Sequence, residues 1–220
     1  MIDLVVWDWN GTVLADTELT VEASNHQIKT FGGNPLTRKE FIKRIYFPIT
    51  DFLVDQGCDP KLLNNPAFAK TFHQYYEARA DKCRTRKGVR EVLKYNNTHK
   101  IDSLVLSNHV SSEIERQLDR RDLSEYFNAV LAHDNCVETS QGNNKVHRFE
   151  RYLSETRQDP HNTLIIGDAP EDVGIGKEFG MVTVALTDGF YPTHQLKASN
   201  PDYLISNVSR LVDILEEQSQ

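Results

Sequence analysis

The chain has 220 residues and a formal net charge of −7 at pH 7. Hydrophobic residues make up 39% and charged residues 26%, which is typical of a folded globular protein and excludes a disordered one. The acidic balance argues against a general affinity for nucleic acid or for an anionic membrane. A bound phosphate would therefore need local donors and a metal ion.

The three cysteines, Cys58, Cys83 and Cys136, are widely spaced and form no CxxC pair. This pattern predicts reduced thiols rather than a disulfide framework. The chain begins without a basic stretch and an apolar signal core, and no run approaches the roughly 18–20 apolar residues of a membrane-spanning helix. We therefore expect a cytoplasmic protein with no membrane partner.

Short apolar, β-branched runs alternate with longer amphipathic segments along most of the chain. The expected strands are residues 2–7, 102–106, 129–132, 163–166, 182–186 and 202–205. The expected helices are residues 88–95, 111–119, 145–156, 171–179 and 208–217. Strands that alternate with helices of this length predict an α/β fold with a doubly wound parallel sheet and right-handed crossovers.

Residues 17–82 interrupt this alternation, because they contain helical patterns and no convincing strand. The expected helices there are residues 17–31, 37–46, 49–56 and 65–81. An all-helical block inside an α/β chain predicts an inserted cap domain. We therefore expect a helical cap domain at 17–82 and an α/β core domain formed by 1–16 and 83–220, with hinges near 13–17 and 81–88.

Polar residues gather at four places where a predicted strand ends or a predicted helix begins. They are Asp8-Trp9-Asn10-Gly11-Thr12, Ser107-Asn108, Lys145 after the turn Gly142-Asn143-Asn144, and Gly167-Asp168-Ala169-Pro170-Glu171-Asp172. Taken singly, the acids could be helix caps and the lysine a solvated surface residue. In open α/β sheets, however, ligands bind at the carboxyl ends of the strands, so the set indicates an active site.

With these four groups in this order, the chain resembles the haloacid dehalogenase (HAD) superfamily, in particular its phosphoglycolate phosphatase-like members with an inserted helical cap. The resemblance covers essentially the whole chain. It implies a Rossmann-like, HAD-type core. It also implies a Mg²⁺-dependent phosphatase, a phosphoric monoester hydrolase that acts on a small phosphorylated metabolite through an aspartyl-phosphate intermediate.

The resemblance further implies a role for each residue. Asp8 would be the nucleophile, and Mg²⁺ would be held by Asp8, the backbone carbonyl of Asn10 and Asp168. Asp172 would hold the water around the metal, a place for which Glu171 is the weaker candidate. The implied catalytic residues are Asp8, Asn10, Ser107 and Lys145, and the implied substrate-binding residues are Gly11, Thr12, Ser107, Asn108 and Lys145.

Asn10 departs from the family pattern, which has an aspartate here as general acid and base. An amide cannot exchange a proton at neutral pH, and general acid–base catalysis is worth about 10²–10⁴-fold in rate. We therefore expect slow turnover and a preference for aryl or acyl phosphates over alkyl phosphates. Three explanations stay open: a natural enzyme that compensates, an engineered trap, or a protein that binds a phosphate ligand without turnover.

Other functions compete with this one. A catalytically silent binding or regulatory protein would keep the same residues. A dehalogenase is disfavoured because Asp168 and Asp172 would repel the nucleophile without a cation. A phosphonate hydrolase would need a cap lysine, for which the candidates are Lys29, Lys39 and Lys43. The histidines show no HxH or HExxH spacing, so we expect no zinc site, and a loop or cap role is favoured for His109.

Overall fold

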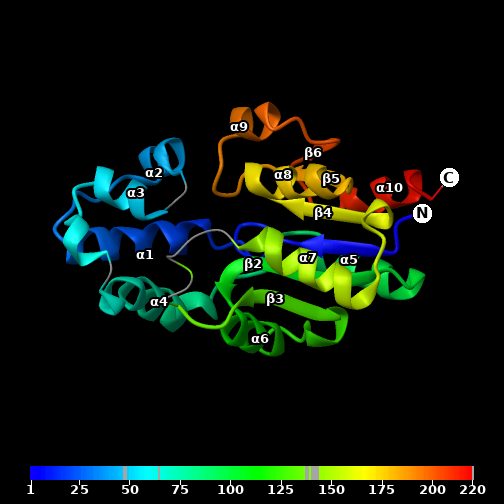
Figure 1. Cartoon of the computed structure of the whole chain (residues 1–220), viewed down its shortest axis with the longest axis horizontal. Helices are drawn as coiled ribbons and strands as arrows, with labels where there is room; N and C mark the ends of the chain where they lie inside the picture. The colour runs from blue at the N-terminus through cyan, green and yellow to red at the C-terminus, as the bar shows by residue number, and fades with distance from the viewer. Residues whose placement is uncertain (47–48, 64, 137–138, 140–143, 220) are drawn as a thin grey trace.

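The computed structural model describes residues 1–46, 49–63, 65–136, 139 and 144–219. Its strands form one parallel, six-stranded sheet in the order β3-β2-β1-β4-β5-β6 (Figure 1). The strands are β1 (Leu4–Trp7), β2 (Asp102–Val110), β3 (Ala129–His133), β4 (Thr163–Gly167), β5 (Val182–Leu186) and β6 (Tyr203–Ile205). This order, which runs outward from β1 in both directions, confirms the predicted doubly wound sheet.

Helices cover both faces of the sheet, and the alternation of strand side chains decides which helix packs on which face. Leu4 and Val6 pack in one apolar cluster with α7 and α8. Val5 and Trp7 point to the opposite face and pack in a cluster with α5, α6 and α10. These helices are α5 (Val89–His99), α6 (Ser111–Asp119), α7 (Lys145–Thr156), α8 (Pro170–Phe179) and α10 (Arg210–Glu217).

Residues 17–82, between β1 and α5, contain the next helices of the chain and lie at one end of the molecule, at the left of Figure 1. We call this range the helical segment. Its elements are α1 (Thr17–Thr30), α2 (Arg38–Arg44), α3 (Ile49–Asp55), the short 3₁₀ helix η1 (Pro60–Leu62) and α4 (Pro66–Ala80). It has an apolar cluster of its own, which includes Ile28, Phe41, Phe52 and Phe68.

Strand β2 is longer than the sequence predicts. The expected strand 102–106 continues through Ser107 and His109 to Val110, because these polar side chains find partners inside the protein. The backbone N–H of His109 donates to Ser107 Oγ at 3.1 Å, and His109 Nε2 lies 2.7 Å from Glu77 Oε1. The prediction that Ser107 follows the strand was therefore wrong: it lies within it.

The structure also contains a short helix that the sequence did not predict, α9 (Thr193–Ala198), whose Leu196 packs on Val173 and Ala185. Two further 3₁₀ helices are η2 (Ser124–Tyr126) and η4 (Pro160–Asn162). Within the described ranges, no helix has the length and apolar character needed to cross a membrane. Each of the three cysteines is free.

Candidate active site

Three acids meet at the carboxyl edge of the sheet. Asp8 directly follows β1 and Asp168 directly follows β4. Because β1 and β4 are parallel neighbours, with Trp7 opposite Ile166, both acids reach the same edge. Asp172 joins them from the first turn of α8. One oxygen atom from each of the three carboxylates lies within 4.8 Å of the other two.

Lys145 is the cation among these acids. It is the first residue of α7, and its Nζ lies 2.8 Å from Asp8 Oδ1 and 2.8 Å from Asp172 Oδ1. Burial alone would lower the pKa of Lys145, but Asp172 and Asp8 raise it well above its ordinary value, so the ammonium stays charged. Gly142 and Asn143 of the predicted turn before this helix lie outside the described residues.

We call Asp8, Asp168, Asp172 and Lys145 the acid cluster. Burial raises the pKa of Asp8 to about 7, against the opposing effect of Lys145. Burial and then the charge of Asp8 raise the pKa of Asp168. Three carboxyl groups and one ammonium leave an excess of negative charge, which a divalent cation would relieve. Carboxylate oxygens are the ligands of a hard cation, so the residues present fit a metal of this kind.

Two loops close on Asp168 and hold it in place. The backbone N–H of Phe190 donates to Asp168 Oδ2 at 2.6 Å. A Cβ atom on Gly11, whose φ is +79°, would overlap the same carboxylate, as would one on Gly189. Thr12 is fully buried, with its hydroxyl 3.5 Å from Asp168 Oδ1. Neither Gly11 nor Thr12, which the sequence predicted to bind substrate, is among the described residues that line the pocket.

Ser107 and Asn108 lie on β2, the strand next to β1, and both line the pocket. Ser107 is 1% exposed. The Asn108 side chain donates to Glu171 Oε2 at 3.1 Å and accepts a hydrogen bond from Arg148 at 3.1 Å. Lys145 bonds Asp172 rather than Glu171 among the two acids of this turn, and the charge of Glu171 adds to the raised pKa of Lys145.

Asn10 has both of its amide hydrogens engaged. Its Nδ2 donates to Asp16 Oδ2 and to Tyr76 Oη, each at 2.8 Å, and the Tyr76 hydroxyl donates in turn to Asp16. The backbone N–H of Gly11 also donates to Asp16, at 2.7 Å. Burial raises the pKa of Asp16. The amide side of Asn10 therefore faces Asp16 and Tyr76, which leaves its carbonyl oxygen for a ligand.

A hydrogen-bonded histidine–glutamate pair that the sequence did not reveal lies beside Ser107. His109 Nε2 is 2.7 Å from Glu77 Oε1, and Glu77 Oε2 accepts hydrogen bonds from Arg116 at 2.7 Å and Gln117 at 3.0 Å. Although burial alone would raise the pKa of Glu77, His109 and the other donors lower it to about 2. We call Glu77, His109 and Arg116 the histidine cluster. The carboxylate comes from α4 and the other two residues from the sheet side of the molecule.

Two neighbours extend the histidine cluster. His73 stacks on His109 with a ring-centroid distance of 5.3 Å, and burial lowers the pKa of His73 to about 3. Ligating atoms of His73, Glu77 and His109 lie within 4.8 Å of one another. On the other side, Gln117 Oε1 accepts a hydrogen bond from Trp9 Nε1 at 3.0 Å. The loop that carries Asn10 is thus tied to α6, and through Glu77 to α4.

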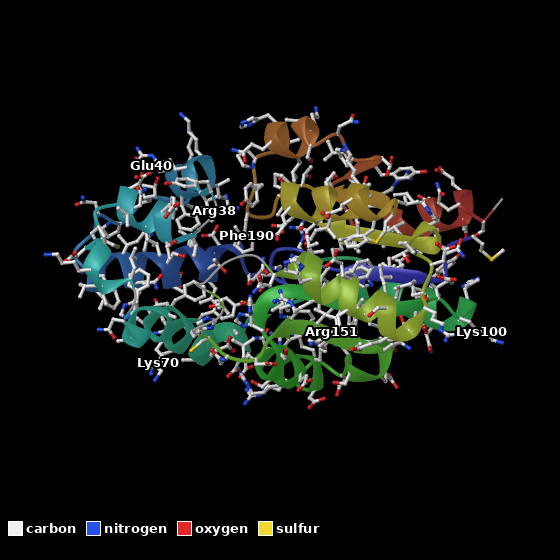
Figure 2. The ribbon with its side chains drawn as sticks, viewed as in Figure 1. Arg38, Glu40, Lys70, Lys100, Arg151 and Phe190 are labelled. Carbon is white, nitrogen blue, oxygen red and sulfur yellow. The ribbon has the colours of Figure 1, made fainter. Side chains whose placement is uncertain are left out.

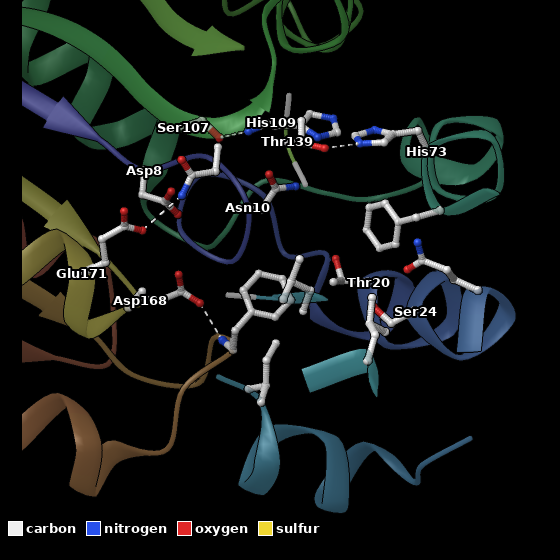
Figure 3. Close-up of a pocket in the computed structure, with 18 of the residues that line it drawn as sticks. Asp8, Asn10, Thr20, Ser24, His73, Ser107, His109, Thr139, Asp168 and Glu171 are labelled. Atoms are coloured by element: carbon white, nitrogen blue, oxygen red, sulfur yellow. Dashed lines mark hydrogen bonds between the residues drawn. The ribbon is translucent and has the colours of Figure 1, made fainter. Parts of the chain in front are cut away.

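A pocket of about 210 Å³ lies between the sheet edge and the helical segment. Figure 3 shows Asp8, Ser107 and Asp168 on one side of it and His73, Thr20 and Ser24 on the other. Phe190 reaches it from the loop after β5, where that loop approaches the helical segment (Figure 2). Most of the apolar side chains in the wall come from the helical segment, and these are Phe41, Ile45, Ile49, Leu53, Phe68, Ala69 and Phe72.

Comparison with known proteins identifies the family. Residues 5–186 match the family described as haloacid dehalogenase-like hydrolase. The chain is similar to the pyrophosphatase PpaX of Halalkalibacterium halodurans, at 23% identity over 215 residues that cover 97% of each chain. It is also similar to the phosphoglycolate phosphatase of Vibrio vulnificus, at 22% identity over 224 residues, which cover 97% of this chain and 96% of that one.

The fold has solved counterparts. A predicted phosphatase from Clostridium acetobutylicum superimposes with a TM-score of 0.84 at 16% identity, over 99% of each chain. The family match, which covers most of the chain, confirms the resemblance stated from the four motifs. The protein belongs to the haloacid dehalogenase-like hydrolase family.

Proposed function

We propose that this HAD-like hydrolase is a Mg²⁺-dependent phosphatase that transfers the phosphoryl group of a small phosphate ester to Asp8 and then to water. The observation that carries the proposal is the acid cluster at the base of the pocket. Asp8 is 8% exposed and lines the pocket, while Lys145 holds one of its oxygens at 2.8 Å. Phosphoryl transfer needs this combination of a positioned nucleophile and charge neutralisation.

The residues of the cluster divide the work. Asp8, Asp168 and the backbone carbonyl of Asn10 would hold Mg²⁺, which would neutralise charge on the phosphoryl oxygens. Asp172 positions the Lys145 ammonium, to which it is bonded, and it lies beside Asp8 and Asp168, where it would hold water around the metal. The Lys145 ammonium and the Ser107 hydroxyl bind the transferring phosphoryl group, and Asn108 borders it. The helical segment, residues 17–82, serves as the cap domain that excludes water from the reaction.

The pocket wall favours a substrate with a neutral, apolar leaving group. Lys145 is the only lysine or arginine among the described residues that line it, and it belongs to the acid cluster. A carboxylate or a second phosphate would lie against Phe41, Leu53 and other apolar side chains, at a desolvation cost. We therefore propose benzyl phosphate-like esters, rather than the pyrophosphate or phosphoglycolate that the names of the relatives indicate for those proteins.

A phosphonate hydrolase gains no support from the structure. Lys29, Lys39 and Lys43 are exposed, and none is among the described residues that line the pocket. A silent binding protein has one observation in its favour. Asn10 stands where the family has its proton carrier, and its amide is engaged with Asp16 and Tyr76.

The test is the release of inorganic phosphate from benzyl phosphate, p-nitrophenyl phosphate, phosphoglycolate and pyrophosphate, with Mg²⁺ and with EDTA. We expect release from the aromatic esters that stops with EDTA and falls about 10⁴-fold or more in Asp8→Asn. The matched control is Asp213→Asn, an exposed acid of α10, which should leave the rate unchanged. Thermal stabilisation by the esters without phosphate release would instead establish the binding protein.

A further inference from the structure

We propose that His109, held by Glu77, is the general acid and base of this active site and carries the proton that Asn10 cannot carry. This inference rests on the proposed phosphatase function and adds a catalytic residue to it. It starts from a chemical gap: an amide at position 10 cannot protonate a leaving oxygen or activate water at neutral pH. Some other group must do so if the protein turns over alkyl esters.

The position of His109 meets this need. It lies on β2 two residues after Ser107, its backbone N–H donates to the Ser107 hydroxyl oxygen, and its side chain lines the same pocket as Asp8 and Asn10. The leaving oxygen of an in-line transfer lies opposite the nucleophile, on the side of the phosphoryl group that faces the helical segment. His109 lies at this boundary beside His73 of that segment (Figure 3), and its Nε2 is 2.7 Å from Oε1 of Glu77 on the same helix as His73.

The hydrogen-bond pattern assigns the two ring nitrogens. Nε2 is paired with Glu77 Oε1 at 2.7 Å, and in the described part of the chain no hydrogen-bond partner is seen for Nδ1. A carboxylate on one nitrogen fixes the tautomer in which the other nitrogen has a free lone pair, and it stabilises the imidazolium when that nitrogen takes a proton. Nδ1 is therefore the atom that would exchange a proton with the substrate and with water.

Glu77 is held so that it can play this part. Its second oxygen accepts hydrogen bonds from Arg116 and Gln117, which keeps the carboxylate ionised and its first oxygen directed at His109. The same contacts argue against a metal ion between His73, Glu77 and His109. Both oxygens of Glu77 already have protein donors, and the Arg116 guanidinium lies 2.7 Å from one of them. A dication beside this guanidinium would be repelled.

The other groups that face His109 do not replace it. His73 stacks on its ring from α4, and its lowered pKa keeps it neutral. Tyr76, also on α4, meets the ring edge-on at 5.4 Å, and its hydroxyl is bonded to Asp16. Asp16 accepts bonds from Asn10, Tyr76 and the Gly11 backbone, so its oxygens are already occupied.

The two half-reactions balance with one proton on His109. In the first, an Asp8 oxygen attacks phosphorus, the bond from phosphorus to the ester oxygen breaks, and that oxygen takes the electron pair and the Nδ1 proton. In the second, a water oxygen attacks phosphorus, its proton passes to Nδ1, and the bond from phosphorus to Asp8 breaks. The products are the alcohol and inorganic phosphate, with Asp8 and the imidazolium restored.

The variant His109→Gln tests the proposal, because glutamine can still donate to Glu77 but cannot exchange a proton. The measurement is kcat/KM for benzyl phosphate, which has a basic leaving group, and for p-nitrophenyl phosphate, which has an acidic one. We expect a loss of about 10²–10⁴-fold for the benzyl ester and less than about tenfold for the nitrophenyl ester. Phosphorylated enzyme should accumulate with the nitrophenyl ester, as seen by mass spectrometry after an acid quench.

Glu77→Gln should change the ratio of the two kcat/KM values in the same direction but by less, since Glu77 positions His109 and stabilises its charge. His147→Gln, an exposed histidine on α7, is the matched control and should keep the wild-type ratio. A wild-type ratio in a folded His109→Gln variant would overturn the proposal while leaving the phosphatase intact. If wild type releases phosphate from neither ester, both proposals fall.

Discussion

The acid cluster borders the pocket and is buried, whereas the histidine cluster reaches the same pocket through His109 and is only partly buried, and the two also differ in charge balance. The acid cluster has three carboxyl groups for one ammonium. In the histidine cluster, the carboxylate of Glu77 bonds Arg116 and His109, and the two other acids that pair with Arg116, Asp81 and Glu113, are about a third exposed to solvent. The first arrangement is incomplete without a cation, whereas the second is complete and can hold a catalytic group in place. Three ligating groups close together therefore do not by themselves indicate a metal site; an excess of buried negative charge does.

The largest expected difference between the two clusters is in their response to the loss of a positively charged side chain. Lys145→Met leaves three buried carboxyl groups unpaired, so we expect a loss of about 3–5 kcal/mol in the free energy of unfolding at pH 8 without metal. Added Mg²⁺ should restore part of it, because the ion replaces the missing charge. Urea unfolding with EDTA and with Mg²⁺ measures both effects.

Arg116→Met is the matched control for that experiment. The Arg116 side chain is 33% exposed, and Glu77 keeps its bonds to His109 and Gln117, so we expect a loss of about 1 kcal/mol that Mg²⁺ does not change. Equal losses in the two variants, or equal recovery with Mg²⁺, would remove the distinction between the clusters.

The two clusters should also respond to pH in opposite directions. The pKa of Asp8 is raised from 3.8 to about 7, so its carboxyl binds more protons in the folded state, and the stability it contributes is lost as pH rises from about 4 to about 7. The pKa of Glu77 is lowered from 4.5 to about 2, so its contribution is full above 4.5 and is lost as pH falls towards 2.

These shifts correspond to at most about 4 kcal/mol for Asp8 and about 3 kcal/mol for Glu77. The measurement is the free energy of unfolding without metal at pH 3–8, for wild type, Asp8→Asn and Glu77→Gln. The difference between wild type and Asp8→Asn should fall with rising pH, and that between wild type and Glu77→Gln should rise. If the two differences in the free energy of unfolding change with pH in the same direction, the assigned pKa shifts are contradicted.

Asn10 lies between the two clusters, because it contacts Tyr76 at the edge of the histidine cluster and follows Asp8 by two residues. Its replacement should have the smallest effect of the changes considered, apart from that of the control variant Arg116→Met. Asn10→Asp would place a second carboxyl group beside Asp16, where the Asn10 amide now lies at 2.8 Å. Two carboxylates at this distance cannot both ionise. We expect a loss of about 1–2 kcal/mol in stability at pH 8 that shrinks at pH 5.

The double variant Asn10→Asp with Asp16→Asn is the matched test of that explanation. It exchanges the amide and the carboxyl group without changing their number, so stability should return towards the wild-type value. A double variant no more stable than Asn10→Asp alone would show that the Asp16 contact is not the cause.

Much of the acid cluster could be predicted from the sequence, because its members follow strands that are adjacent in a doubly wound sheet. Asp8 and Asp168 come directly after apolar runs, and Lys145 begins an amphipathic helix. Parallel pairing then brings the ends of β1 and β4 together without any information on side-chain packing.

The histidine cluster could not be predicted in this way. Glu77 and His109 are 32 positions apart, and they meet only because α4 packs against the end of β2. Tyr76 and Asp16 are 60 positions apart and depend on the same packing. Each partner lies in an ordinary helical or strand pattern, so no local spacing marks the pair. The only local sign of this cluster was the run of polar residues at Ser107 and His109. Hydropathy alone predicts that the strand ends there, because it contains no information on the partners that these side chains bond in the folded protein.

The hydrogen bond from Trp9 to Gln117 has a practical consequence. Gln117 also donates to Glu77, so any motion of α4 away from the sheet changes the surroundings of the Trp9 indole. The chain has one other tryptophan, Trp7, whose indole nitrogen is buried with no hydrogen-bond partner among the described residues, so Trp7→Phe removes no such bond. In that variant, the fluorescence emission of Trp9 would report, without an added dye, whether the helical segment is open or closed over its ligand.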